Sequence, residues 1–144
     1  MSLLQIADQN PTTVTPNATV LEAIQKMLDN HVGAVCVLDE ERRVAGIFTE
    51  RDIMRELATH GFDPAKTQVG SLMTTPVEMA TELTSEAEAL SIMLERHYRH
   101  LPIVDHDARL LGILSIRHVL EARIDELVEE LDEIRQQRDN ALRQ

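Results

Sequence analysis

The chain has 144 residues, 43% hydrophobic and 27% charged, which is enough for one compact domain or two very small repeats with a buried core. Its formal net charge of −11 argues against DNA, RNA or an anionic membrane as the main partner, because each favours a basic protein. Aromatic residues make up only 2%, which also disfavours base stacking on single-stranded nucleic acid.

The N-terminus and the apolar runs bear on where the protein works. The first residues lack the basic region of a secretory signal, and no apolar run approaches the roughly 18 residues that a membrane helix needs. We therefore expect a cytoplasmic protein without a membrane segment. The single cysteine, Cys36, lies in an apolar run, which predicts a buried structural thiol.

A duplication organises the chain. A shift of 66 residues aligns residues 19–54 with 85–120, and ten of these 36 positions are identical. The identical pairs are Glu22/Glu88, Ala23/Ala89, Met27/Met93, Leu28/Leu94, His31/His97, Asp39/Asp105, Arg43/Arg109, Gly46/Gly112, Ile47/Ile113 and Arg51/Arg117. One structural unit has therefore been used twice.

Both copies predict the same elements in the same order: an extended lead-in, a helix, two strands and a closing helix. In the first copy the lead-in is 12–15, and the first helix begins at the capping box of Thr19 and Glu22. The two strands are 35–38 and 44–48, and the closing helix runs from 50 toward 61. In the second copy the lead-in is 77–80, and the first helix begins at the capping box of Ser85 and Glu88. The two strands are 101–104 and 110–114, and the closing helix begins at 116.

Each copy alone, at about 50–60 residues, would be only marginally stable, so we expect the two to pack sheet against sheet in an α/β fold. The expected boundaries are 1–62 for the first repeat, 63–70 for a linker, 71–122 for the second repeat and 123–144 for a helical extension.

The segment from Glu121 holds eight acidic and four basic residues and neither Gly nor Pro. Its apolar residues follow the 3-4-3 spacing of a coiled-coil seam. They are Ile124, Leu127, Leu131 and Ile134. Two heptads are also compatible with a helix folded back on its own domain, so both self-association and internal packing remain open.

Residues 46–52, Gly-Ile-Phe-Thr-Glu-Arg-Asp, carry the most suggestive chemistry. A buried strand leads into a helix start, where backbone amides and the helix dipole attract anions. Thr49 can offer a hydroxyl to a phosphate, Arg51 a charged contact, and Asp52 can accept from two ribose hydroxyls. The alternative is structural, because Thr49 and Asp52 also match a capping box.

At this point the sequence resembles a known family. Two capped helix-strand-strand-helix units, each closing on Gly-hydrophobic-x-Thr/Ser, look like a tandem pair of CBS domains, the Bateman module. Residues 99–105, Arg-His-Leu-Pro-Ile-Val-Asp, are similar to the family's basic-Leu-Pro-Val-hydrophobic-Asp signature, and the resemblance covers roughly residues 8–122.

The resemblance implies two β-α-β-β-α repeats with pseudo-twofold symmetry, a homodimer, and a regulatory protein that controls a partner without catalysis. The implied ligand is an adenine nucleotide, AMP, ADP or ATP, with NAD or S-adenosylmethionine ranked behind them. No catalytic cofactor and no metal are implied. The regulated partner is unknown.

Carried over residue by residue, the resemblance implies one complete cleft. Its expected residues are Ile47, Pro76 and Val77 for adenine, Thr49 and Asp52 for ribose, and Arg99, His100 and Arg117 for phosphates. Arg51, the charged contact expected from the helix start itself, completes the set of nine. In the second cleft, Ser115 and His118 replace Thr49 and Asp52, and uncharged Gly33 and Ala34 stand opposite, so we expect weaker binding, no binding or a different ligand.

Other functions are less well supported. A zinc site around His97 and His100, with Asp105 and His106, is disfavoured because no cysteine lies at ligand spacing. An enzyme is disfavoured because no nucleophile-base arrangement and no Gly-rich phosphate loop is present. The basic run 96–100 favours a localised anion site, and the main rival is a ligand-free scaffold that acts through oligomerisation.

Overall fold

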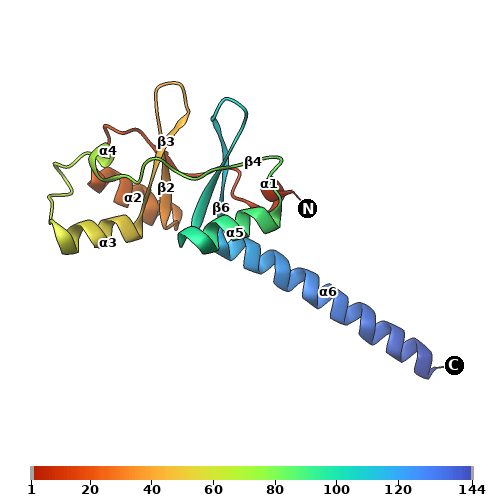
Figure 1. The fold of residues 1–144 in the computed structure, drawn as a ribbon. Coiled ribbons are helices and arrows are strands. Elements are labelled where there is room, and N and C mark those ends of the chain that lie inside the picture. Colours follow the sequence, from red (N-terminus) through yellow and green to blue (C-terminus); the bar gives the residue numbers. More distant parts are fainter. Residues whose placement is uncertain (1, 144) are drawn as a thin grey trace.

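The computed structural model describes residues 2–143. Two repeats lie side by side, and a long helix projects from the second one (Figure 1). The first repeat consists of β1 (Thr13–Val14), α2 (Val20–Asn30), β2 (Ala34–Leu38), β3 (Val44–Thr49) and α3 (Glu50–Thr59). The second consists of β4 (Ala80–Thr81), α5 (Glu86–Arg96), β5 (His100–Val104), β6 (Leu110–Ser115) and α6 (Ile116–Leu142). The predicted β-α-β-β-α order is confirmed in both.

Each repeat forms a three-stranded sheet with the same topology. The strand orders are β1-β2-β3 and β4-β5-β6, with the first pair parallel and the second antiparallel. Thr49, at the end of β3, pairs with Ala34, and Ser115, at the end of β6, pairs with His100. The start of each closing helix therefore lies beside the start of its repeat's middle strand.

The helices begin and end where local chemistry requires. Capping boxes form at Thr19, Thr49, Ser85 and Ser115, each with the side chain three residues later. His31 and His97, one of the identical pairs, end the first helix of each repeat, and both adopt the left-handed conformation at the C-cap, with φ 55° and 59°.

The two sheets pack against each other, as predicted. A buried cluster between them contains Cys36 and Ile47 from the first repeat and Ile113 from the second. Burial raises the pKa of the Cys36 thiol to about 12, so this thiol is protonated and structural.

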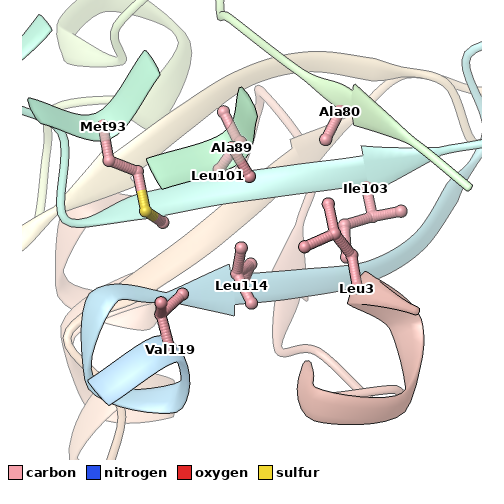
Figure 2. Close-up of a cluster of buried hydrophobic side chains, with 8 residues drawn as sticks. All are labelled: Leu3, Ala80, Ala89, Met93, Leu101, Ile103, Leu114 and Val119. Carbon is pink, nitrogen blue, oxygen red and sulfur yellow. The ribbon is translucent and has the colours of Figure 1, made fainter. Parts of the chain in front are cut away.

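Two short helices each pack on the core of the repeat that they do not directly precede. Leu3 of α1 (Leu3–Ile6) is 1% exposed and belongs to the core of the second repeat, where it points toward Ile103 and Leu114 (Figure 2). Val69 of α4 (Val69–Leu72) is fully buried in the core of the first repeat. The expected boundaries at 62 and 71 stay a prediction. The segment before the first repeat packs on the second repeat, and the segment before the second repeat packs on the first.

Glycine is required where these connecting segments cross the sheets. A Cβ at Gly46 would lie 2.9 Å from the carbonyl oxygen of Thr74, and one at Gly112 would lie 2.7 Å from that of Asp8. Ile47 and Ile113, the next residues, form isolated β-bridges with the same two partners. In both repeats the glycine thus leaves room for the backbone of the connecting segment, and the isoleucine that follows pairs with it.

The C-terminal extension continues α6 without interruption to Leu142. Its last buried residue is Ala122, and Ile124, Leu127, Leu131 and Ile134 are 52–60% exposed. The alternative of a helix folded back on its own domain is therefore wrong. Within residues 2–143, no helix combines the length and the apolar character needed to cross a membrane.

Candidate functional site

A cleft of about 380 Å³ opens between the repeats. The first repeat contributes the end of β3 and the start of α3, and the second contributes residues 96–100 together with the segment before β4. Seven of the nine residues expected in the first cleft line it: Ile47, Thr49, Arg51, Asp52, Val77, Arg99 and His100.

Pro76 and Arg117 do not line this cleft. Pro76 is exposed, while its neighbour Val77 faces the cleft. Arg117 is the repeat equivalent of Arg51, so it starts the second repeat's closing helix and lines the other cleft, where its Nε lies 3.6 Å from an oxygen of Glu121. The expected placement of these two residues is corrected accordingly.

Asp52 is 3% exposed and already accepts several hydrogen bonds. Its Oδ2 accepts from the backbone amide of Thr49 at 3.0 Å and from the Thr49 hydroxyl at 3.2 Å. Its Oδ1 accepts from Arg55 at 2.7 Å and from the hydroxyl of Thr74 at 3.0 Å. A carboxylate has about four acceptor positions, so a ribose hydroxyl can bind here only by replacing one of these donors.

The start of α3 is less open to an anion than the sequence suggested. Asp52 donates its backbone amide to the Thr49 hydroxyl at 3.2 Å, and Thr49 donates its own to Asp52. The amide of Glu50 donates to the carbonyl of Gly33 at 3.0 Å. Three of the four terminal amides therefore have acceptors, and anion recognition rests on side chains.

Charge in the cleft differs from charge in the whole chain. The chain has 25 acidic residues and 14 Lys and Arg, but the cleft is lined by four arginines and three carboxylates. The arginines are Arg51, Arg55, Arg96 and Arg99, and the carboxylates are Glu50, Asp52 and Glu78. Such a local excess of positive charge can attract a phosphate within the roughly 8 Å over which charges act at physiological salt.

Arg51 and Arg96 are tied to the second repeat. Arg51 crosses the cleft and donates to the carbonyl oxygen of His97 at 3.3 Å, and Arg96 lies 3.5 Å from Glu78. No ion pair within 4.0 Å is recorded for Arg99 among residues 2–143. Arg99 is therefore the cation with fewest competing contacts.

His100 is not the cation that the sequence suggested. Burial, with smaller contributions from the neighbouring His118 and Arg99, lowers its pKa to about 4. Near neutral pH the ring is uncharged, so His100 can donate one hydrogen bond to a ligand but brings no charge.

A second cleft, of about 540 Å³, lies on the other side of the same strand ends. Ser115 and His118 line it as expected, and they form a capping box: the backbone amide of Ser115 donates to Nδ1 of His118 at 3.0 Å. Arg99 and His100 line both clefts. The two sites therefore share part of their lining.

The lining residues that the sequence analysis did not name as ligand candidates include Arg55, Thr74 and Tyr98. Arg55 lies three residues after Asp52 on one helix, a spacing that could have indicated the ion pair. Tyr98 lies within the basic run 96–100. Thr74 reaches Asp52 only through the crossing segment, which no local signal reveals.

Comparison with known proteins gives a consistent family. The CBS domain family matches residues 4–59 and 69–125. A 17.7 kDa uncharacterized protein of Acidianus ambivalens is 40% identical over 121 residues, which cover 84% of this chain and 72% of that protein. A mitochondrial CBS domain-containing protein of Arabidopsis thaliana is 33% identical over 132 residues, which cover 89% of this chain and 64% of that protein.

Solved structures share the fold. A protein with CBS domains from Burkholderia ambifaria is 31% identical, with a TM-score of 0.80 over 87% of this chain and 95% of that one. The structure of CBSX2 in complex with AMP is 25% identical, with a TM-score of 0.73 over 86% of this chain and 96% of that one. A CBS domain pair in complex with 5′-methylthioadenosine and S-adenosyl-L-methionine has a TM-score of 0.79 at 22% identity, over 88% of this chain and 98% of that one.

Proposed function

Because the chain belongs to the CBS-domain family and contains two CBS domains, we propose that it is a regulatory module that binds an adenine nucleotide in the cleft between them. The observation that carries the proposal is the composition of this cleft. A buried acid and a hydroxyl from the first repeat, Asp52 and Thr49, lie across from an arginine-rich run of the second, in a chain of net charge −11.

The roles follow from the positions. Ile47 and Val77 offer an apolar surface to the adenine ring, since both pack at the edge of the inter-sheet core. Asp52 and Thr49 receive the ribose hydroxyls, and Arg99 receives the phosphate with a hydrogen bond from neutral His100. The AMP complex of CBSX2 supports AMP as the first ligand to test.

Regulation requires that the ligand prefer one arrangement of the repeats, because equal affinity for two states shifts nothing. A nucleotide held by Asp52 and Arg99 contacts both repeats and would fix their relative orientation. We propose that this change, transmitted to a partner or within a homodimer, is the output. Catalysis has no part in this proposal.

The direct test is thermal unfolding and calorimetric titration with AMP, ADP, ATP, NAD and S-adenosylmethionine. One site at a hundredfold excess over its Kd adds about 2.7 kcal/mol to the free energy of unfolding. We expect at least one adenine nucleotide to stabilise the chain. Arg99→Gln should weaken AMP at least about tenfold, whereas Arg143→Gln, which removes the same charge at the far end of α6, should not.

The saturated hydrogen bonding of Asp52 favours a second candidate, a ligand-free scaffold. In that case Asp52 serves the fold alone. The scaffold predicts no stabilisation by any of the five compounds, and unchanged behaviour of Arg99→Gln. The same titrations therefore decide between the two.

A further inference from the structure

The C-terminal half of α6 is exposed over its whole described length. Every residue from Leu127 to Arg143 is exposed, and Figure 1 shows this part projecting away from both repeats. From Arg123 to Leu142 it extends about 30 Å at 1.5 Å per residue. A helix without tertiary packing is only marginally stable in water, so a partner for its apolar side is expected.

The apolar side is continuous and regular. Leu120, Ile124, Leu127, Leu131 and Ile134 are 52–60% exposed and alternate in steps of four, three, four and three. These steps place them at successive d and a positions of a heptad repeat. A single exposed leucine such as Leu83 is common on any protein surface, but five exposed leucine and isoleucine side chains along one stripe indicate an interface.

We propose that this stripe pairs with the same stripe of a second copy as a parallel, two-stranded coiled coil. The flanking charges choose both partner and orientation. Glu130 is at position g and Arg135 at position e, so in a parallel pair each Glu130 faces the other copy's Arg135. In an antiparallel pair that places Ile124 opposite Ile134 and Leu127 opposite Leu131, the two Glu130 side chains would lie across from each other, which is unfavourable.

Ile124, Leu127 and Arg138 favour two strands, whereas Leu131 and Ile134 do not. In the first full heptad Ile124 is at position a and Leu127 at position d, the combination typical of parallel dimers. Arg138 occupies a later a position, where a polar residue restricts register and strand number. The second heptad carries Leu131 and Ile134 in the reverse order, which is why the number of strands has to be measured.

The coil would be joined directly to the cleft. The backbone amide of Ile116, the first residue of α6, donates to the carbonyl oxygen of Arg99 at 2.9 Å. The pairing itself needs no nucleotide, so the proposal stands or falls independently of the proposed function. A parallel coil would place both repeat pairs at one end of the assembly.

The first experiment measures mass by sedimentation equilibrium on the full chain without nucleotide. We expect twice the 16.3 kDa of one chain. Leu127→Asp with Leu131→Asp should raise the dimer Kd by at least about 100-fold, because each chain would bury two carboxylates in the seam. Glu129→Gln, at the outward position f, should not change it.

The double variant should still fold, since residues beyond Ala122 do not pack on the repeats. Far-UV circular dichroism and thermal unfolding of the repeats check this. A monomeric wild-type chain, a tetramer, or a double variant that remains dimeric would each overturn the proposal.

The second experiment measures orientation. Residues at position d meet their own copies across a parallel seam, so Ile134→Cys should form an interchain disulfide under mild oxidation. Glu133→Cys, which points outward at position c, is the matched control. Buried Cys36 does not interfere. A dimer that gives no disulfide at position 134 would overturn the parallel arrangement.

Discussion

Asp52 combines a structural and a proposed recognition role in one carboxylate. It closes the capping box at the start of α3 and joins that helix to Thr74 on the crossing segment. Its repeat equivalent, His118, closes a capping box in the same geometry but carries no carboxylate. A comparison of Asp52 with His118 can therefore distinguish the capping role from the proposed role in ligand binding within one molecule.

Asp52→Ala and His118→Ala should both lower the free energy of unfolding by about 1–2 kcal/mol, because each removes a cap partner. Only Asp52→Ala should also weaken AMP, by at least about tenfold, since ribose loses its acceptor. Thermal unfolding and calorimetric titration measure the two effects separately. If Asp52→Ala is destabilised but binds AMP normally, Asp52 acts solely as a cap.

Arg55 is the exposed donor on Asp52, with 52% of its side chain accessible, and is therefore the donor that a ribose hydroxyl can most easily replace. Arg55→Gln should strengthen AMP binding or leave it unchanged. Arg99→Gln, which also removes one positive charge from the cleft, should weaken it. Weakening by both variants to the same extent would mean that Arg55 contacts the nucleotide itself.

His100 makes folding depend on pH. Its pKa is lowered to about 4 in the folded chain, first by burial and then by His118 and Arg99, from the ordinary 6.5. Between pH 6.5 and 4 the unfolded chain therefore binds more protons, so the contribution of His100 is complete above pH 6.5 and declines as the pH falls toward 4.

The loss over this window should be about 1–3 kcal/mol. Urea unfolding of the wild type and of His100→Gln at several pH values measures it. The free energy difference between the two proteins should change with pH, because the exposed carboxylates titrate in both and cancel. A constant difference from pH 7 to 4.5 would contradict the lowered pKa.

The sequence contained much of the site, and the failures have a clear cause. Thr49, Asp52 and the run 96–100 could be found because the duplicated motif and the charge pattern are local. Arg117 was assigned to the wrong cleft because its side depends on how the repeats pack. The Thr74 contact with Asp52 depends on a crossing segment that leaves no periodic signal.

At the scale of elements, the periodicity predicted the order and nearly the bounds. The middle strands begin at Ala34 and His100, one residue earlier than predicted, because each pairs with the last residue of the next strand. The short helices α1 and α4 were not predicted. Four residues carry too little periodicity, and both owe their place to packing on the other repeat's core.

The exchange of α1 predicts an unusual stability effect. Leu3→Ala should lower the free energy of unfolding by about 2–5 kcal/mol, because Leu3 fills the core of the second repeat beside Ile103 and Leu114. Leu83→Ala, at a side chain that is 95% exposed, should change it by no more than about 0.5 kcal/mol. Chemical denaturation measures both, and equal effects would show that α1 does not belong to that core.

At the scale of the molecule, the two repeats form one binding unit. Each contributes one side of the first cleft, and the cluster between the sheets holds the sides together. Arg99 and His100 face both clefts, so a phosphate in one cleft competes with a phosphate in the other for the same guanidinium. The duplication thus creates two cavities that share Arg99 and His100.

We therefore expect one AMP per chain in a calorimetric titration at protein concentrations well above the Kd. The second cleft offers His118 in place of a ribose acceptor, and it loses Arg99 once the first cleft is filled. Arg117→Gln, which changes only the second cleft, should leave stoichiometry unchanged and affinity within about twofold. Two AMP molecules per chain, or loss of binding in Arg117→Gln, would show that the nucleotide occupies the second cleft instead.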